Sequence, residues 1–397
     1  MEIGVLADDL TGALASATRL RSSGLHPRVH WYREEAPAEA DALVVDMRTR
    51  DGGSEPADQA RTWGSRLRAT GCRRYELRID STLRGAAGDE LRGLLEGTGL
   101  TDAWVLAVPA FPDAGRTTVD GVQRVAGTEG DLGIDVGERI FGANGSAVIG
   151  RGEIESGGER VLAFMHRQAR RGTRHFVADA THDLHLSELA GAAGLVEDEG
   201  TDLVTASPGA WLRFHPVRAA RSGRDPERAA RRPGFVLVVL SSPSATNRAQ
   251  LDELVSVEQP IVLGVEDASR EVTEGIPSPR LIVVETIRSA DPAPERVAAH
   301  AEAAASAAAS LMDRLRGQEE PCAGVIVSGG HAAACLAEAL GARGIEAETE
   351  TRPLCGTGTL VGGAWDGLRI VTKGGLVGDP STLRELVASL RGDRADG

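Results

Sequence analysis

Short apolar runs rich in β-branched residues alternate with helical patterns along most of this chain. In the first half these runs predict the strands Ile3–Leu6, Ala42–Val45, Tyr75–Ile79, Trp104–Val108, Phe176–Ala178 and Leu203–Thr205. Patterns with helical spacing lie between several of them, as at Glu55–Thr70 and Gly88–Glu96. This alternation predicts an α/β fold of βαβ units, with a mainly parallel sheet flanked by helices on both faces.

The same alternation returns after residue 234, where the expected strands are Phe235–Leu240, Ile261–Val265, Leu281–Val284, Gly324–Val327 and Arg369–Thr372. A long alanine-rich helix is expected over about Pro294–Arg316. Residues 218–234 contain six arginines, two prolines and two glycines without an apolar period, which is typical of a linker, although such a basic stretch can also bind an anion. We therefore expect two α/β domains, residues 1–217 and 235–397, joined by the linker 218–234.

Composition excludes several classes of protein. The 397 residues carry 58 acidic and 44 basic side chains, a formal charge of −14, which argues against non-specific binding to nucleic acid or to an anionic membrane. No apolar run approaches the roughly 20 residues that span a bilayer. The N-terminus has no basic signal-peptide region, and the four cysteines have no C-x-x-C spacing. We expect a cytoplasmic chain with reduced thiols, no nucleic-acid partner and no membrane partner.

Charged side chains follow several strands of the first half, where open α/β sheets bind their ligands. Asp8 and Asp9 come directly after the first strand and can bind a hydroxyl, accept a proton or hold a metal, or simply cap the next helix. The run Arg78–Gly85 combines a carboxylate, two hydroxyls and two guanidiniums, and it predicts either an anion site or a surface ion-pair cluster. The loop Pro109–Thr118 presents Arg116, unless it is only a structural turn.

The second half carries segments suited to phosphate. Hydroxyls and glycines follow strands at Ser241–Thr246, Ser328–His331, Leu354–Thr359 and Thr372–Gly375. Each signal is weak alone, because a plain Ser/Thr cap explains the first, and neither a P-loop nor a dinucleotide fingerprint is present. However, 43 of the 44 basic residues are arginine, and the single lysine, Lys373, lies in the last of these segments. A compact ammonium at that place indicates a nucleotide phosphate site.

These segments, in this order, resemble the four-carbon acid sugar kinase family, which includes 3-oxo-tetronate, D-threonate and D-erythronate kinases. The matching runs are ADDLTGA (7–13), DSTLRG (80–85), VPAFPDAGRTT (108–118), SSPSATNRAQL (241–251), VSGG (327–330) and TKGG (372–375). The resemblance implies an N-terminal domain that binds the acid and a C-terminal domain that binds ATP. It also implies an active site in the cleft between the domains, Mg²⁺ as a cofactor, and a small-molecule four-carbon acid as substrate. A homodimer is compatible with it.

The resemblance also implies roles for single residues. In the N-terminal domain we expect Asp9 to be the base, with Asp80 as the second candidate, and the acid to contact Asp8, Arg50, Ser81, Thr82, Arg84, Gly85 and Arg116. In the C-terminal domain we expect the nucleotide to be lined by Ser242, Ser244, Gly329, Gly330, Cys355, Gly356, Thr357, Gly358, Lys373, Gly374 and Gly375. No residue is assigned to the metal.

The chain departs from the family pattern at several places. The family usually has lysine at Arg78, asparagine at Ala86, aspartate at Ala15 and Asp-Thr at His331–Ala332. The departures at Ala15 and at His331–Ala332 keep a competing hypothesis open, a protein that binds the acid or the nucleotide without transferring phosphate. A nicotinamide-dependent dehydrogenase is disfavoured, because no G-x-G-x-x-G follows the first strand.

Overall fold

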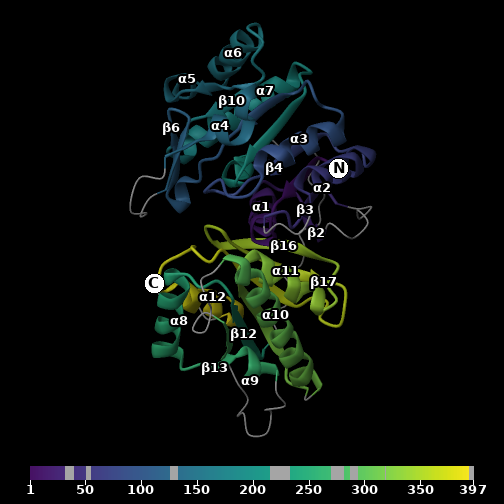
Figure 1. The fold of residues 1–397 in the computed structure, drawn as a ribbon, viewed down its shortest axis with the longest axis vertical. Coiled ribbons are helices and arrows are strands. Elements are labelled where there is room, and N and C mark those ends of the chain that lie inside the picture. Colours follow the sequence, from purple (N-terminus) through teal and green to yellow (C-terminus); the bar gives the residue numbers. More distant parts are fainter. Residues whose placement is uncertain are drawn as a thin grey trace. The chain divides into compact units, whose positions relative to one another are not determined.

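The computed structural model describes residues 1–31, 40–50, 55–125, 133–214, 233–269, 281–286, 294–317 and 319–392. The chain divides into two compact units, Met1–Gly223 and Arg224–Gly397. Figure 1 draws the first unit in purple to teal and the second in green to yellow. The division falls inside the segment expected as a linker, of which residues 218–232 lie outside the described residues.

The sheet of the first unit is built from parallel strands. Their order is β2 (Pro27–Trp31), β3 (Ala42–Asp46), β1 (Ile3–Ala7), β4 (Arg74–Arg78), β11 (Leu203–Ser207), β5 (Trp104–Ala107), β10 (His175–Ala178) and β9 (Ala147–Ile149). Each neighbouring pair runs parallel. All five residues of β1 are buried, as expected for a strand covered on both faces.

Helices cover the two faces of this sheet. On one face α2 (Pro56–Ala69), α3 (Ala87–Thr98) and α4 (Val136–Phe141) enclose an apolar core that includes Tyr75 and Leu77 of β4. On the other face Glu76 of β4 meets the 3₁₀ helix η3 (Ala210–Phe214), which packs against α1 (Leu10–Ser22) and α7 (Asp183–Asp198). The helices α5 (Arg151–Glu155) and α6 (Gly158–Ala169) pack against α7.

A small antiparallel sheet adds to the first unit. It consists of β6 (Arg116–Val119), β7 (Val122–Val125) and β8 (Ile134–Asp135), and short 3₁₀ turns lie at Pro112–Ala114 and Gly142–Asn144. The hydrophobic pattern predicted none of these strands, because they are short and several of their side chains are only partly buried.

The second unit has a mixed sheet. Its order is β13 (Ile261–Gly264), β14 (Leu281–Glu285), β12 (Phe235–Leu240), β15 (Cys322–Ser328), β18 (Arg369–Lys373), β17 (Cys355–Val361) and β16 (Gly344–Arg352). The strands β13, β14, β12, β15 and β18 run parallel to one another. The strand β17 runs antiparallel to both of its neighbours, β18 and β16. The segment after Leu354, expected as a loop, is therefore the strand β17, and this corrects the prediction.

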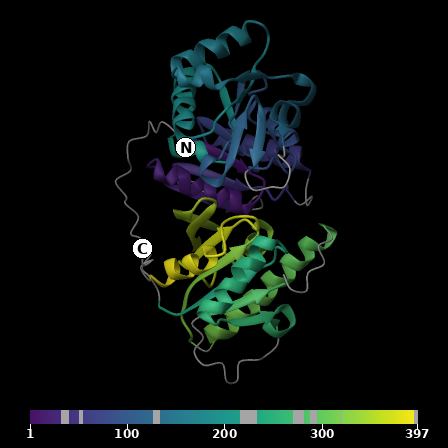
Figure 2. The same ribbon diagram turned by 90° about the vertical axis from the view of Figure 1, so that its left-hand side faces the viewer.

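Helices also flank this second sheet. The helices α8 (Ala245–Glu258) and α12 (Thr382–Arg391) pack together over an apolar core that includes Val238, Ile326 and Val371. Figure 2 shows α12 in yellow beside α8 in green. The long helix α10 (Pro294–Gly317) packs against α11 (Gly330–Ala339) and α9 (Val265–Ser269).

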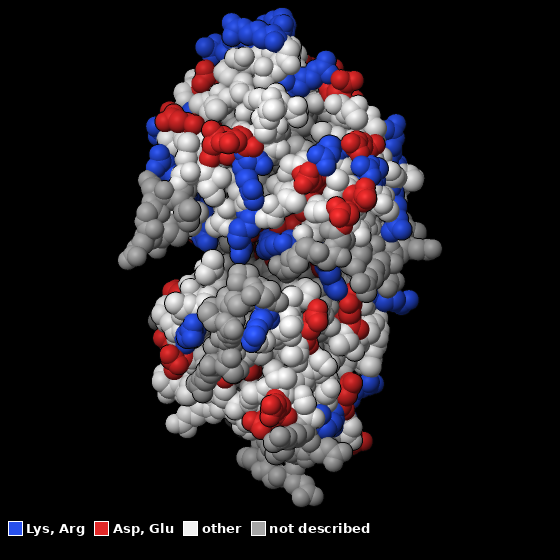
Figure 3. All heavy atoms as spheres, in the orientation of Figure 1, with Lys and Arg blue, Asp and Glu red and all other residues white. Residues whose placement is uncertain are grey.

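Each strand and helix predicted from the hydrophobic pattern is present, with ends shifted by a few residues at most. The α/β fold class, with mainly parallel sheets flanked by helices, is therefore confirmed. On the face drawn in Figure 3, acidic and basic side chains are interspersed, and basic side chains gather over α6.

Candidate active site

The strand register of the first unit brings the predicted charged residues to one edge of the sheet. Ala7 at the end of β1 lies opposite Asp46 of β3 and Arg78 of β4. Because these strands are parallel, the residues that follow them emerge at the same carboxyl edge. Asp8, Arg50 and Asp80 therefore come from three different segments to one place.

Arg50 binds the two adjacent aspartates. Its Nε donates to Asp8 Oδ2 at 2.7 Å and its Nη2 donates to Asp8 Oδ1 at 2.7 Å, which is a two-nitrogen grip on one carboxylate. Its Nη1 donates to Asp9, and its Nη2 lies 3.5 Å from Asp80 Oδ1. One guanidinium thus joins all three aspartates, a geometry that arginine allows and lysine does not.

Asp9 also begins a helix. Its Oδ1 accepts a hydrogen bond from the backbone N–H of Gly12 at 2.7 Å, so Asp9 is the N-cap of α1. The structural explanation of this residue, a helix cap, therefore holds alongside its place in the charged cluster.

Arg78 reaches the same aspartates from below α1. Its Nη1 donates to Asp8 Oδ1 at 2.8 Å and to Asp9 Oδ1 at 3.4 Å. A Cβ atom at Gly12 would lie 2.0 Å from the Cζ of Arg78. Gly12 therefore leaves the space that the Arg78 guanidinium occupies.

Asp80 holds a second arginine. Arg84 donates from Nε to Asp80 Oδ2 and from Nη2 to Asp80 Oδ1, both at 2.9 Å. Burial alone would raise the pKa of Asp80, but the hydrogen bonds from Arg84 and the charge of Arg50 outweigh it and hold that pKa well below its usual range. Asp80 is therefore a fixed anion, and 57% of the Arg84 side chain remains exposed above it.

The other residues of the predicted acid site surround this cluster. The Thr82 backbone N–H donates to Asp80 Oδ2 at 3.2 Å, and Ser81 is buried. Gly85 has a φ of 85°, and a Cβ there would lie 3.4 Å from Asp8 Oδ2. Arg116 is the first residue of β6. Burial lowers its pKa and the negative charge of Asp80 acts to raise it, so Arg116 and Asp80 interact electrostatically.

Gln123 connects two of these loops, and sequence reasoning missed it. Its Nε2 donates to the carbonyl oxygens of Ser81 and Pro109, both at 2.9 Å, and its Oε1 accepts from Thr118 Oγ1 at 2.7 Å. The side chain is fully buried, so this amide fixes the loop of Asp80 relative to the loop of Arg116.

Two further buried carboxyls lie at this edge and were also missed. Glu90 of α3 accepts a hydrogen bond from Thr49 Oγ1, and burial together with the charge of Asp8 raises its pKa to about 7. Asp46 ends β3, and burial raises its pKa to about 7 as well. Their places in the first turn of a helix and at the end of an apolar strand gave no motif by which to find them.

In the second unit, the register gathers the predicted phosphate segments in the same way. Leu240 lies opposite Ser328, and Lys373 lies opposite both Ser328 and Cys355. The turns after β12, β15 and β18 therefore emerge at one edge, and the long helices α8 and α11 start there.

Close contacts join these turns. Ser244 caps α8, since its Oγ accepts from the Asn247 N–H at 3.0 Å, and it donates to the carbonyl oxygen of Gly375. A Cβ at Gly375 would lie 2.2 Å from Ser242 Oγ. The Gly329 N–H donates to the Lys373 carbonyl oxygen at 2.9 Å, and the φ of Gly329, 115°, is one that favours glycine. Gly330 begins α11 and Gly374 continues the last turn.

Lys373 belongs to a strand, whereas the sequence placed it in the glycine-flanked turn that follows the strand. It is the last residue of β18, and its side chain is fully buried. Its Nζ donates to Asn247 Oδ1 at 2.8 Å and to Ser328 Oγ at 3.2 Å. The ammonium thus lies below the turns.

The run Cys355–Gly358 belongs to β17, next to β18. Cys355 packs in the apolar core of the second unit, and burial raises the pKa of its thiol to about 12. Gly356 and Thr357 are buried in the same strand, and Gly358 lies opposite Ile370. These residues support the edge from within the sheet.

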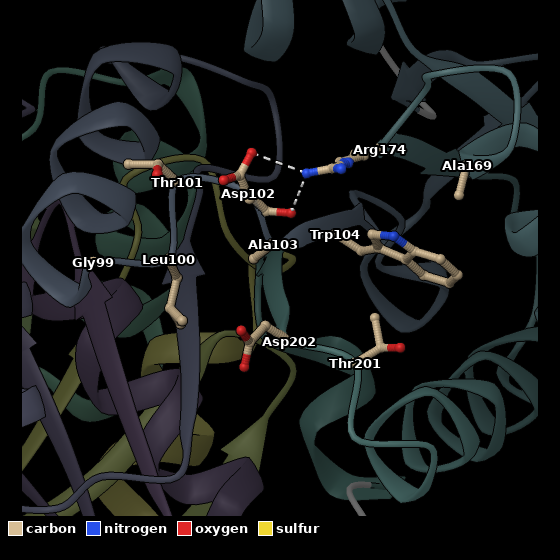
Figure 4. Close-up of a pocket in the computed structure, with 10 residues that line it drawn as sticks. All are labelled: Gly99, Leu100, Thr101, Asp102, Ala103, Trp104, Ala169, Arg174, Thr201 and Asp202. Carbon is tan, nitrogen blue, oxygen red and sulfur yellow. Dashed lines mark hydrogen bonds and ion pairs between the residues drawn. The ribbon is translucent and has the colours of Figure 1, made fainter.

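The pocket drawn in Figure 4 lies at neither of these two carboxyl edges. That pocket, of about 440 Å³, is lined by residues that precede β5 and β11, among them Asp102 and Asp202. It therefore lies at the amino end of the first sheet, opposite the aspartates. Arg174 Nη1 donates to Asp102 Oδ1 at 2.9 Å there, and the two side chains form an ion pair.

The described part of the chain holds no group of three or more His, Cys, Asp or Glu side chains that could hold a metal ion. It also has no helix long and apolar enough to cross a membrane.

Comparison with known protein families matches both units. A sugar-binding N-terminal domain matches residues 3–132, and a nucleotide-binding C-terminal domain matches residues 237–383. The protein is thus of the class that pairs a sugar-binding domain with a nucleotide-binding domain.

Curated relatives share nearly the whole chain. A D-erythronate kinase of Heliobacterium modesticaldum is 27% identical and the match covers 94% of each chain. A D-threonate kinase of Bordetella bronchiseptica is 27% identical over 98% of this chain and 97% of its own. A 3-oxo-tetronate kinase of Pseudomonas fluorescens is 25% identical over 99% and 98%. The chain belongs to the four-carbon acid sugar kinase family.

Solved structures share the fold. A protein of Salmonella typhimurium LT2 has a TM-score of 0.73 at 20% identity, over 97% of this chain and 98% of its own. A Haemophilus influenzae protein of the DUF1537 family has a TM-score of 0.66 at 20% identity, over 98% and 100%. At this identity the likeness concerns the fold alone.

Proposed function

We propose that this protein is an ATP-dependent kinase that phosphorylates the terminal hydroxyl of a four-carbon sugar acid. The observation that carries the proposal is the cluster of Asp8, Asp9, Arg50, Asp80 and Arg84 at the carboxyl edge of the first unit. Such a cluster offers guanidiniums to a carboxylate and carboxylates to hydroxyl groups. The curated relatives named for D-erythronate, D-threonate and 3-oxo-tetronate support this class of substrate.

The acid binds through arginine in this proposal. Arg84 is half exposed above Asp80, and Arg116 is its electrostatic neighbour, so these guanidiniums hold the substrate carboxylate. The aspartates hold the hydroxyl groups. Fixing the acceptor hydroxyl in this way contributes to catalysis by orientation, at most on the order of 7–11 kcal/mol.

Asp9 is the proposed base that takes the proton of the terminal hydroxyl. Asp80 serves poorly in that role, because its depressed pKa leaves it little affinity for a proton. Asp8 is held by two nitrogens of Arg50 and one of Arg78, and it is more deeply buried than Asp9. Asp9 lies at the start of α1, and 11% of its side chain is exposed against 2% for Asp8.

ATP binds to the turns of the second unit in this proposal, through Ser242, Ser244, Gly329, Gly330, Gly374 and Gly375. Free backbone N–H groups at the starts of α8 and α11 suit phosphate oxygens. We propose that Mg²⁺ enters with the nucleotide, because substrate phosphates and water usually supply most of its ligands. We also propose a cytoplasmic location, which the four free thiols support, and the homodimer stays a prediction.

The test is acid-dependent formation of ADP. Purified protein is incubated with ATP, Mg²⁺ and D-threonate, D-erythronate or 3-oxo-tetronate in turn, and ADP is measured against a reaction without acid. We expect ADP to form faster with at least one acid. Nucleotide binding without acid-dependent ADP would favour the non-catalytic alternative.

The Asp9→Asn variant tests the base. We expect kcat to fall by about 10²–10⁴-fold, the usual contribution of a general base, while thermal unfolding shifts little because asparagine also caps helices. Asp102→Asn, at the opposite end of the same sheet, is the matched control and keeps its turnover. Near-normal turnover of Asp9→Asn would remove Asp9 from this role.

A further inference from the structure

The ammonium of Lys373 is a buried charge held by neutral groups. Its side chain is fully buried, and among the described residues its Nζ donates only to Asn247 Oδ1 at 2.8 Å and Ser328 Oγ at 3.2 Å. Buried cations normally have a carboxylate partner, because the charged form is costly in a low dielectric. Burial accordingly lowers the pKa of Lys373 to about 8.

Asn247, which no motif singled out, is the centre of this arrangement. It lies in the first turn of α8 and is fully buried. Its Oδ1 accepts from Lys373 Nζ and, at 3.0 Å, from Ser328 Oγ, while its Nδ2 donates to the Ser242 carbonyl oxygen at 2.8 Å. One amide therefore joins the carboxyl ends of β12, β15 and β18.

We propose that Asn247 is a positioning residue that, with Ser328, keeps the Lys373 ammonium as an uncompensated cation beneath the turns that bind the nucleotide phosphates. The inference rests on the proposed nucleotide site, and it names the Lys373 ammonium as the source of that site's preference for phosphate. An amide suits this task, because it accepts a hydrogen bond from the ammonium without cancelling the charge. Aspartate, of the same shape, would form an ion pair and cancel it.

The neighbours of Lys373 leave it as the group that titrates. From α8 and β15 it meets Asn247 and Ser328, which do not ionise in this range. From β17 it meets the Cys355 thiol, whose pKa of about 12 keeps it neutral. Glu350, Arg352 and Glu385 act on Cys355 from farther away. A bound anion stabilises the charged ammonium, so nucleotide binding near pH 8 takes up protons.

The first experiment compares ligands with and without phosphate. Asn247→Asp and Lys373→Met are each titrated calorimetrically with ATP, ADP and adenosine at pH 7.5, using the full chain. We expect ATP and ADP affinity to fall at least tenfold in both variants and adenosine affinity to change less than twofold. A merely structural role of Asn247 would weaken adenosine equally.

Gln250→Glu is the matched control. Gln250 is a buried amide of the same helix whose Nε2 donates to the carbonyl oxygens of Val377 and Asp379 and does not touch Lys373. This variant keeps the wild-type ratio of ATP to adenosine affinity. Lys373→Met removes a buried charge and keeps an apolar stem, so it remains a valid test even where Asn247→Asp fails to fold.

The second experiment measures proton uptake. Wild-type binding of ADP at pH 8, measured in buffers of different ionisation enthalpy, takes up a fraction of a proton, and Lys373→Met takes up none. Two results would overturn the inference: a ratio of ATP affinity to adenosine affinity that is unchanged in Lys373→Met, or equal proton uptake by the wild type and Lys373→Met. A wild-type protein that binds no nucleotide at all is a different result, because it would overturn the proposed function first.

Discussion

At the scale of single residues, arginine and lysine have separate tasks in this protein. Arg50 and Arg84 each hold a carboxylate through two nitrogens, which requires the planar guanidinium fork. Lys373, the only lysine, lies where a compact ammonium fits between an amide oxygen and a hydroxyl. This setting gives a structural reason for a lysine at position 373 in a chain whose other basic residues are all arginine.

Gly12 tests whether the position of Arg78 matters for acid binding. In Gly12→Ala the new methyl group occupies the place of the Arg78 guanidinium, which must leave Asp8 and Asp9. We expect the KM for the acid to rise about tenfold, with the KM for ATP unchanged, in steady-state kinetics.

The matched control for this change is Gly191→Ala. Gly191 lies in α7 with open space at its Cβ position, so alanine there gains helix propensity of up to about 1 kcal/mol and leaves both KM values unchanged. Equal acid KM values in the two variants would show that the position of the Arg78 guanidinium does not affect acid binding.

Residue-level predictions succeed where chemistry is local in sequence. Asp8, Asp9, Asp80 and Arg84 lie in short motifs directly after strands, and the structure brings them together. Glu90, Gln123 and Asn247 act through contacts 41, 42 and 81 residues away along the chain. A buried glutamate, glutamine or asparagine inside an element resembles any polar residue in the sequence, and only its tertiary partners reveal the role.

At the scale of elements, Glu76 links β4 to β11 and η3 through a buried network. It accepts hydrogen bonds from Thr205, Ser207 and Trp211, and burial raises its pKa to about 7. Between pH 4.5 and 7 the folded protein therefore holds a proton that the unfolded chain has released. The unfolding free energy falls as pH rises through this window, because the unfolded state binds fewer protons there.

Glu76→Gln removes this dependence. The quantity to compare is the unfolding free energy of the wild type minus that of the variant. We expect this difference to decrease from pH 5 to pH 8, by about 3 kcal/mol at most. Urea denaturation at both pH values measures it. Glu90 and Asp46 have raised pKa values too, but they are present in both proteins and cancel in the difference. A difference that does not vary with pH would contradict the assigned pKa shift.

The elements that sequence analysis missed share a weak hydrophobic signal. The strands that were predicted are short apolar runs, whereas the missed parallel strand β2 begins with proline and β6 to β9 are short and partly exposed. In β16, Ile345 and Ala347 alternate with glutamates, and this period of two was a signal for a strand. The pairing of β16 with β17 then explains why the segment after Leu354 is a strand rather than a loop.

At the scale of the whole molecule, the first unit extends beyond the part that matches the sugar-binding domain. That match ends at residue 132, yet β11 lies between β4 and β5 in the sheet. Residues 133–214 therefore complete the sheet that carries the aspartates. The second unit carries its phosphate turns on its own sheet, so each ligand of the proposed reaction has a separate scaffold.

The most direct test of the account is transfer of a labelled phosphoryl group. The wild-type protein is incubated with Mg²⁺, ATP labelled with ¹⁸O in its γ-phosphoryl group, and each of D-threonate, D-erythronate and 3-oxo-tetronate, and the acids are examined by mass spectrometry. The account predicts that one acid gains a labelled phosphoryl group, and that Asp9→Asn suppresses the product by orders of magnitude. Label found only in ATP or inorganic phosphate with all three acids would contradict it.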